Sequence, residues 1–447
     1  MRSLWTNRRY VAWLISDTAK GLATGLFAFA IPLIALLVTN DPAQAGVIGG
    51  VGMVVRLVVL LYGGVLADRH NRIALMLLGT GVATVLSLGF TLLALGDALT
   101  FASLLIVEVL LVTRAGLFEP ASESALKEIV PAEAMGRAQA ANQARDAILQ
   151  LGGGPLGGAL LVVGAWLVGV VMTVAYAFSA ITAWMLRRMP APTAADDADN
   201  SDERADVEAV EAEEADADEP SRASAPAPAR DTLRELREGF SFLFSRPDLS
   251  GVLWIITIIN LGFNAATTTV IFSLQQDGYS ELTIGWLSAV LGGSMLLGAL
   301  VAPLLVPRVG AGILTISGLC IVTVGSAVLA SVREPWAIAI VLGASVFLLP
   351  ALNSAMLGYF MVATPSRLLG RANSAAGALG MGAMPLAPLI AGFGLTWVGR
   401  EWTMLFAAVI CLVATVLALG NRTLRALPAE PGWAAHAAQF EDAVTRR

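Results

Sequence analysis

The stretch VPAEAMGRAQAANQ, residues 130–143, recurs in altered form as ATPSRLLGRANSAAG, residues 363–377. A proline, a glycine and an arginine keep the same order and spacing in the two copies: Pro131, Gly136 and Arg137, then Pro365, Gly370 and Arg371. A duplication at this distance predicts that the two halves of the chain share one architecture.

The composition shows in which environment both halves fold. Of the 447 residues, 56% are hydrophobic and 14% are charged, and the mean hydropathy is +0.73, outside the range of ordinary soluble domains. An apolar run of about 18 residues can cross a hydrocarbon core about 30 Å thick. We predict twelve membrane-spanning helices, at 10–38, 46–66, 73–96, 99–119, 138–164, 165–186, 249–274, 282–306, 311–332, 336–360, 372–397 and 401–420.

The repeat divides these helices into two sets, because each copy precedes the helix that follows the fourth span of its half. We therefore predict an all-α membrane protein whose twelve transmembrane helices form two six-helix bundles. A pseudo-two-fold axis along the membrane normal would relate the bundles, with a cavity between them. This architecture is typical of transporters.

The two predicted bundles are joined by an acidic segment, DDADNSDERADVEAVEAEEADADE, which has no apolar periodicity and cannot form a core. We expect the domains to be an N-terminal bundle (1–190), a disordered cytoplasmic linker (191–230), a C-terminal unit (231–425) and a cytoplasmic tail (426–447). The C-terminal unit begins with an amphipathic surface helix, in which Leu233, Leu236, Phe240 and Leu243 recur at helical spacing.

The distribution of basic residues predicts the orientation. Most of the 28 lysines and arginines lie at the termini or in loops after even-numbered helices, whereas Arg333 and Arg400 lie on the other side. By the positive-inside rule both termini are cytoplasmic, in a multi-pass protein of the cell (plasma or inner) membrane. The stretch GGVLADRHNR, residues 63–72, is then a cytoplasmic turn, where Arg69 and Arg72 can hold lipid headgroups or carboxylates.

Apart from acids at the span ends, seven charged residues fall inside the predicted spans, and all seven belong to the N-terminal half: Asp17, Lys20, Arg56, Glu108, Arg114, Arg145 and Asp146. A charge that faces lipid is expensive, so these side chains should face the bundle interior or a cavity. Two stripes at helical spacing suggest cavity walls, Asp17 with Thr24 and Glu108 with Glu119. Structural ion pairs are the alternative, with Asp17 on Lys20, Glu108 on Arg56, and Asp146 on Arg114 or Arg145.

Glycines mark the helices that should pack most closely. The fifth helix contains LGGGPLGGA and the eighth GGSMLLGA, while the second contains GVIGGVG and the eleventh GALGMGA, which suggests two facing pairs. These glycines lie in apolar spans and lack a P-loop lysine, so we expect no nucleotide site. Cys320 and Cys411 are far apart in sequence and predict no metal cluster, and we expect neither enzyme activity nor a cofactor.

Several of these motifs resemble those of the major facilitator superfamily, especially proton-coupled exporters of the macrolide-efflux and siderophore-export kind. GVLADRHNR (64–72) is similar to the signature loop between helices 2 and 3, with Asn71 in place of the usual glycine and Ile73 in place of a second basic residue. GPLGG is similar to the antiporter signature of helix 5, through Gly154, Pro155 and Gly158, with Ala159 replacing the final glycine. LFEPASESALKEIVP and GRAQAANQ resemble the loop between helices 4 and 5 of the efflux group.

The resemblance also implies a role for the turn at 63–72. Its residues would form a latch that holds the two halves together on the cytoplasmic side, with Asp68 facing the start of helix 11 near residues 370–373. Unpaired backbone N–H groups at a helix N-terminus favour an anion. The predicted latch residues are Gly64, Asp68, Arg69, Arg72 and Arg371.

We expect the protein to export an amphipathic small molecule (drug, antibiotic or siderophore-like) in exchange for protons, by rocking of the bundles. The alternatives are an importer or uniporter of a small metabolite, and a receptor or scaffold that acts through the acidic linker. Its partners would be the substrate, protons and the lipid bilayer, with no nucleic acid, and the chain would be a monomer. The predicted substrate cavity contains Thr24, Asn260, Asn264 and Asn353.

Proton exchange requires a carboxylate that binds a proton in one state and releases it in another. Glu108 and Asp17 lie on helices 4 and 1, which line the cavity in this superfamily, whereas Asp146 is adjacent to Arg145 and is expected to be paired. Lys20 lies one turn from Asp17 and can hold it ionised throughout the cycle. We therefore favour Glu108 as the proton site, followed by Asp17.

Overall fold

The computed structural model describes residues 6–130, 132–190 and 229–445, and all its regular elements are helices. Twelve spans are long and apolar enough to cross a membrane, which confirms the predicted fold class. The first six are α1 (Arg8–Thr39), α2 (Pro42–Arg69), α3 (Arg72–Leu95), α4 (Phe101–Ile129), α5 (Ala132–Val163) and α6 (Ala165–Arg188). The rest of the chain contains α9 (Ala229–Ser245), α10 (Pro247–Gln276), α11 (Glu281–Leu305), α12 (Ala311–Val328), α13 (Pro335–Phe347), α14 (Leu349–Ala363), α15 (Ser366–Gly382), α16 (Leu386–Trp397), α17 (Gly399–Gly420), α18 (Arg422–Arg425) and α19 (Trp433–Thr445).

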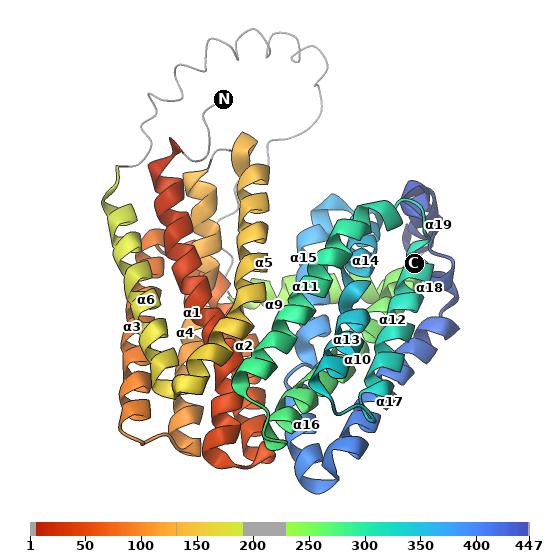
Figure 1. The fold of residues 1–447 in the computed structure, drawn as a ribbon. Coiled ribbons are helices and arrows are strands. Elements are labelled where there is room, and N and C mark those ends of the chain that lie inside the picture. The colour runs from red at the N-terminus through yellow and green to blue at the C-terminus, as the bar shows by residue number, and fades with distance from the viewer. Residues whose placement is uncertain (1–5, 131, 191–228, 446–447) are drawn as a thin grey trace.

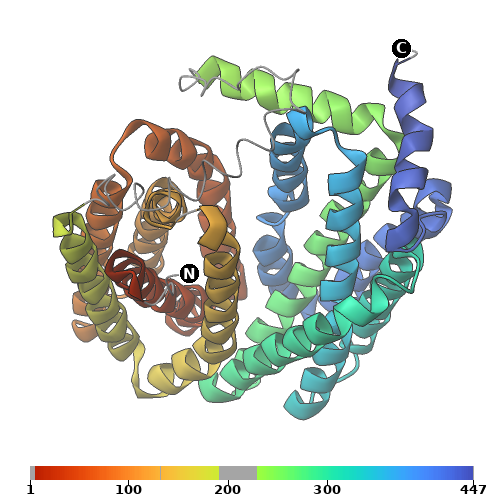
Figure 2. The same ribbon diagram turned by 90° about the horizontal axis from the view of Figure 1, so that it is seen from above.

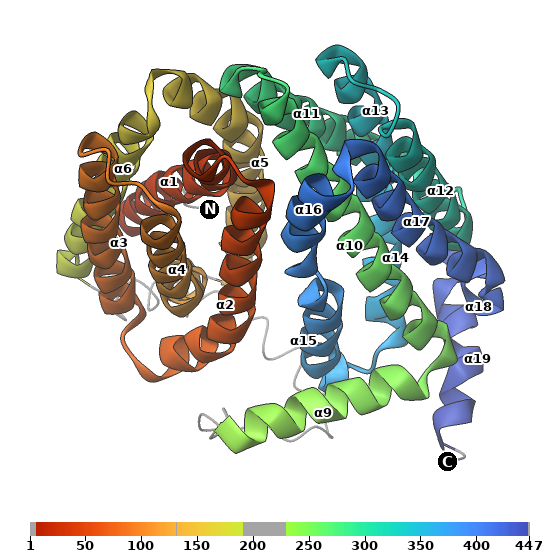
Figure 3. The same cartoon turned by 90° about the horizontal axis from the view of Figure 1, so that it is seen from below.

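The helices form two bundles side by side, α1–α6 in one and α10–α17 in the other (Figures 1 and 2). We call the end at which α6 finishes and α10 begins the linker end, and the end with the α1–α2 and α10–α11 turns the opposite end. The two bundles meet along α2 with α16 and along α5 with α11 (Figure 3).

Of the predicted turn at 63–72, only His70 and Asn71 lie outside the helices. Helix α2 ends at Arg69, and α3 begins at Arg72. The Asn71 side chain accepts a hydrogen bond of 2.9 Å from the backbone N–H of Ala74. The asparagine that replaces the usual glycine is therefore the N-cap of α3.

Two helices extend further toward the linker end than the sequence predicted. Helix α4 continues to Ile129 and α5 starts at Ala132, so residues 120–129, beyond the predicted span 99–119, are helical. Pro120 lies inside α4 without ending it. These additional turns carry Glu123 and Lys127, because a helix that projects beyond the hydrocarbon core no longer needs apolar residues.

The predicted tenth and eleventh spans are each divided into two helices. The tenth breaks at Leu348, between α13 and α14, and the eleventh breaks between Gly382 and Leu386, around Pro385. A proline at a helix start removes a backbone donor that the helix does not use, so Pro350 and Pro385 suit the beginnings of α14 and α16.

Glycines bring the two bundles into backbone contact near the opposite end. A Cβ at Gly158 of α5 would lie 2.4 Å from the carbonyl oxygen of Glu281, and one at Gly154 would lie 2.7 Å from that of Gly285, both on α11. The fifth and eighth spans therefore pair as predicted. On the other side, Gly46 of α2 faces Pro388 of α16, where a Cβ would lie 2.4 Å from the carbonyl oxygen.

The second and eleventh spans pair as predicted, but through a different stretch of the eleventh span. GALGMGA lies on α15, where a Cβ at Gly377 or Gly382 would meet open space within 4 Å. The contact is made instead by PLAPLIAG on α16, where Gly392 faces the carbonyl oxygen of Pro42. The break before α16 explains the difference, because it allows the two halves of this span to face different surroundings.

The segment after α17, predicted to be a cytoplasmic tail, contains α19, which packs on the C-terminal bundle. Trp433 is buried against Gly358 of α14, and the Tyr359 hydroxyl lies 2.9 Å from Nδ1 of His436. At the same end α9 packs across α15, with Leu243 buried (Figure 3). The side chains of Leu233 and Leu236, and residues 191–228 of the predicted linker, lie outside the described part of the chain.

Candidate functional site

A cavity of about 1180 Å³ lies between the two bundles. Helices α1, α2, α4 and α5 form one wall, and α10, α11, α13 and the start of α14 form the other. Glu123 and Gln139, which line it toward the linker end, are exposed. The glycine contacts of α5 with α11 and of α2 with α16 close the opposite end.

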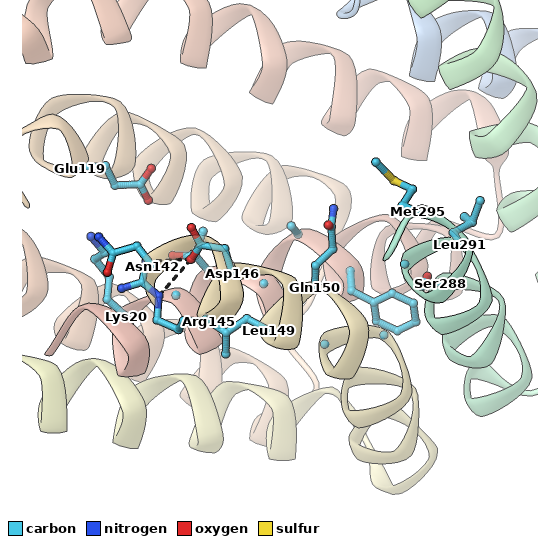
Figure 4. A pocket seen from close by; sticks show the side chains of 18 of the residues that line it. Lys20, Glu119, Asn142, Arg145, Asp146, Leu149, Gln150, Ser288, Leu291 and Met295 are labelled. Carbon is cyan, nitrogen blue, oxygen red and sulfur yellow. Dashed lines mark hydrogen bonds and ion pairs between the residues drawn. The ribbon is translucent and has the colours of Figure 1, made fainter. Parts of the chain in front are cut away.

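The two walls differ in chemistry. The wall from the N-terminal bundle is polar and charged, with Asp17, Lys20, Thr24, Arg56, Glu119, Glu123, Gln139, Asn142, Arg145, Asp146 and Gln150. The wall from the C-terminal bundle is mostly apolar, with Phe263, Asn264, Ile271, Ser288, Leu291, Met295, Val346 and Leu349. Figure 4 shows the charged side chains gathered on one side of the cavity and Leu291 and Met295 of α11 on the other.

Asp17 joins three helices at the cavity wall. It is 8% exposed, and Lys20 Nζ contacts its Oδ1. Ser122 of α4 donates a hydrogen bond of 2.5 Å to the same oxygen. Arg145 Nη1 of α5 lies 2.7 Å from Oδ2, as an ion pair without hydrogen-bond alignment. Two cations and a hydroxyl therefore compensate this buried carboxylate.

The cluster continues from Arg145 toward the centre of the cavity. Its Nη2 lies 2.7 Å from Asp146 Oδ1 (Figure 4), and its guanidinium lies 5.9 Å from the centre of the Trp13 ring. Of the two partners predicted for Asp146, the structure thus has Arg145. The other, Arg114, is buried and donates a hydrogen bond of 2.9 Å to the Tyr176 hydroxyl, which lies 3.1 Å from that of Thr24.

Glu108 lies behind the cavity wall and not in it. It is 6% exposed, and its Oε1 lies so close to α2 that a Cβ at Gly52 would be 2.0 Å from it. Its Oε2 has no hydrogen-bond partner among the described residues. Of the predicted stripe, Glu119 lines the cavity and Glu108 does not. The reason is that α2 covers α4 near the opposite end, whereas the bundles diverge near the linker end.

Arg56 lies one turn beyond Gly52 on α2 and lines the cavity with an exposed side chain. It is close enough to Glu108 to interact with it electrostatically. Within the described residues the two form no ion pair at 4 Å or less, in contrast to the predicted alternative.

The three asparagines predicted for the substrate cavity occupy different places. Asn264 lines it. Asn260 donates a hydrogen bond of 3.2 Å to the carbonyl oxygen of Gly380 and so joins α10 to α15, outside the wall. Asn353 is exposed on α14, also away from the wall, because the break at Leu348 leaves Leu349 as the α14 residue that faces the cavity.

Two of the predicted latch residues, Arg72 and Arg371, form ion pairs within their own half of the chain. Arg72 Nη1 lies 3.0 Å from Glu128 Oε1 of α4, and Arg371 Nη1 lies 2.6 Å from Glu238 Oε2 of α9. Arg69 is exposed, and a Cβ at Gly64 would meet open space within 4 Å. The side chain of Asp68 lies outside the described residues, so its predicted contact with α15 stays a prediction.

The sequence is similar to known membrane transporters. A model of the Major Facilitator Superfamily matches residues 15–384. The enterobactin exporter EntS of Shigella dysenteriae serotype 1 (strain Sd197) is 28% identical over 425 residues, which cover 89% of this chain and 91% of that protein.

Two solved structures have a similar fold. One is a bacterial homologue of the iron transporter ferroportin in an inward-facing state, with a TM-score of 0.68, 14% identity, and coverage of 94% of this chain and 99% of that one. The other is a bacterial homologue of the human lysosomal transporter Spinster in an inward-facing and unoccupied conformation. Its TM-score is 0.61, with 14% identity and 99% of each chain covered.

Proposed function

We propose that this chain, which belongs to the major facilitator superfamily and is thus a multi-pass membrane transporter and not an enzyme, exports an amphipathic small molecule in exchange for protons. The observation that carries the proposal is the cavity of about 1180 Å³ between the bundles, with one charged and one apolar wall and one closed end. A molecule with a polar group and an apolar body fits two such walls. Alternating access follows if the bundles rock so that the closed end opens and the open end closes.

Orientation decides from which side the substrate enters. Lys127, Arg187 and Arg188 all lie at the linker end, and the positive-inside rule therefore places that end in the cytoplasm. In this state the cavity is then open to the cytoplasm, and substrate enters it from that side of the cell membrane. A cysteine placed at Gly278, in the turn after α10, should react with a membrane-impermeant thiol reagent from outside the cell, and reaction only from inside would reverse the orientation.

Export is favoured over import because the curated relative is named an exporter and spans nearly the whole chain. The test is accumulation of amphipathic compounds in inside-out vesicles that contain the protein, after a pH gradient with an acidic interior is imposed. Accumulation that collapses with the gradient supports the proposal. Uptake into intact cells with no accumulation in inside-out vesicles would show an importer. Deletion of residues 194–222 should leave transport intact, whereas it should abolish the function of a scaffold that acts through the linker.

The proton site is best supported at Glu108. Asp17 has Lys20, Arg145 and Ser122 around its carboxylate, so it has a structural role in joining α1, α4 and α5. Asp146 is exposed and paired with Arg145. Glu108 is buried and has an oxygen without a hydrogen-bond partner in the described residues, which is the situation in which a carboxyl group gains most from binding a proton.

The same proposal gives Asp68 its role. Arg72 pairs with Glu128 and Arg371 with Glu238, each within its own half of the chain in this state. Asp68 would bind the N-terminal end of α15 when the bundles close at the linker end. It would therefore stabilise the outward-open state.

A further inference from the structure

Arg56 is the most deeply placed charged residue of the cavity wall. It lies fourteen residues beyond Pro42, the first residue of α2 at the opposite end, or about 21 Å along the helix at 1.5 Å per residue. Counted in the same way from the opposite ends of their own helices, the other charged residues of the wall lie about 25 to 33 Å away. They are Asp17, Lys20, Glu119, Glu123, Arg145 and Asp146.

Among the described residues, the guanidinium of Arg56 has a long-range electrostatic interaction with Glu108 but no ion pair at 4 Å or less in this state. The Arg56 side chain is exposed to the cavity. Glu108 lies behind it, buried against Gly52. A cation at membrane depth is unfavourable unless a counter-charge or water meets it, and a guanidinium matches the oxygens of a carboxylate, sulfonate or phosphate in a bidentate way.

The residues at similar depth complete a site for one end of a molecule. Thr24, Gln150 and Asn264 line the cavity at about 18 to 23 Å from the opposite ends of their helices, by the same residue count. Gln150 offers an amide to the cavity at this depth, whereas the Thr24 hydroxyl lies 3.1 Å from that of Tyr176 and Asn264 Nδ2 donates a hydrogen bond to the carbonyl oxygen of Asn260. Phe263, Leu291 and Met295 form the facing wall and offer apolar contact. The acidic residues lie nearer the mouth, and one of them, Asp146, is paired with Arg145.

We propose that the cavity binds amphipathic organic anions, with the anionic group on Arg56 and the apolar body against Phe263, Leu291 and Met295. The proposal rests on the proposed function, because it names the substrate class of the same cavity. The acidic residues at the mouth do not compete with the bound anionic group for Arg56. They lie about one helical turn or more nearer the linker end.

The test is binding of two probes that share a ring system and differ in charge, 2-naphthalenesulfonate and 2-naphthylmethylammonium. The full chain in lipid nanodiscs is equilibrated with each probe by dialysis, and empty nanodiscs give the background. We expect the sulfonate to bind at least about tenfold more tightly than the ammonium, as loss or gain of a charge-assisted hydrogen bond implies. Arg56→Gln should lose that preference, whereas Arg56→Lys should keep it with weaker sulfonate binding, because an ammonium retains the charge but not the bidentate geometry.

Arg333→Gln is the matched control, because Arg333 is an exposed arginine whose ion pair with Glu401 lies at the opposite end. Equal affinity for the two probes, tighter binding of the ammonium, or an Arg56→Gln variant with unchanged sulfonate affinity would overturn the proposal. If Arg56→Gln does not fold, the comparison of the two probes on the unmodified chain and on Arg56→Lys still decides.

The binding test needs neither a direction of transport nor a proton gradient, which separates it from the proposed function. Sulfonate binding that depends on Arg56, without accumulation in inside-out vesicles, would leave the anion site standing and reject proton-coupled export. Accumulation of cationic or neutral amphipaths by a chain that does not bind the sulfonate would support proton-coupled export and reject the anion site.

Discussion

Gly158→Ala should destabilise the closure of the cavity at the opposite end. A Cβ at this position would lie 2.4 Å from the carbonyl oxygen of Glu281 and 2.9 Å from Cα of Leu282, both backbone atoms of α11. Ordinary van der Waals contact begins at 3.4 Å. Because backbone atoms cannot turn aside as a flexible side chain does, α5 and α11 must separate by about 1 Å.

Overpacking of this kind typically costs about 1 to 3 kcal/mol. The penalty falls on the state described here, in which α5 and α11 are in contact, and is relieved when the opposite end opens. Since about 1.4 kcal/mol corresponds to a tenfold change in an equilibrium constant, the ratio of outward-open to inward-open protein should rise about 5- to 150-fold. The fold itself should persist, because the substitution adds one methyl group to a helix.

The assay is labelling of a cysteine at Leu291, which lines the cavity on α11, in a background with Cys320 and Cys411 replaced by alanine. A membrane-impermeant reagent applied at the opposite end should react faster in the Gly158→Ala variant. Gly152→Ala is the matched control, because Gly152 lies on the same helix and a Cβ there would meet open space within 4 Å. Equal labelling rates in both variants at equal expression would refute the assignment of this contact as the closure.

Three further substitutions have expected outcomes. Gly52→Ala should displace the Glu108 carboxylate, which a Cβ would approach to 2.0 Å, and should reduce proton-driven efflux by about tenfold or more. Gly81→Ala, with open space around it, should not reduce efflux. Equal efflux rates in the two variants would reject this prediction. Asp17→Asn leaves Lys20 and Arg145 without their shared counter-charge and should lower the free energy of unfolding by about 3 to 5 kcal/mol, and unchanged thermal unfolding in nanodiscs would contradict the structural role. Asp68→Asn should leave expression intact and slow efflux, because a charge at a helix terminus contributes about 0.3 to 2 kcal/mol to the stability of the outward-open state. Normal efflux at normal expression would show that the latch is absent.

The number of helices and their division into bundles could be predicted because each depends on local composition or on the repeat. An apolar run of sufficient length has few alternatives to a spanning helix in lipid. The pairing of α5 with α11 was also predictable, since Gly154 and Gly158 allow a close backbone approach. In contrast, the division of the eleventh span into α15 and α16 moved the contact with α2 away from the most glycine-rich stretch.

Which face of a helix meets the cavity was harder to predict, because one helix can have different neighbours along its length. Glu108 and Glu119 share a stripe on α4, yet α2 covers the first and the cavity reaches the second. A signal on the fifth span was available, since Asn142, Asp146 and Gln150 recur every four residues and all line the cavity. The partner of Arg114 had no such signal, because the Tyr176 hydroxyl that it contacts belongs to a distant helix.

The measurement that tests the account most directly is proton-coupled efflux by Glu108→Gln in reconstituted vesicles. Glu119→Gln is its control, because Glu119 lies on the same helix and lines the cavity. We predict that Glu108→Gln still binds substrate and exchanges it between the two sides without a gradient, but loses uphill efflux driven by a pH gradient, while Glu119→Gln keeps it. Uphill efflux by Glu108→Gln at the normal rate, with normal proton movement, would contradict the assignment of Glu108 as the proton site.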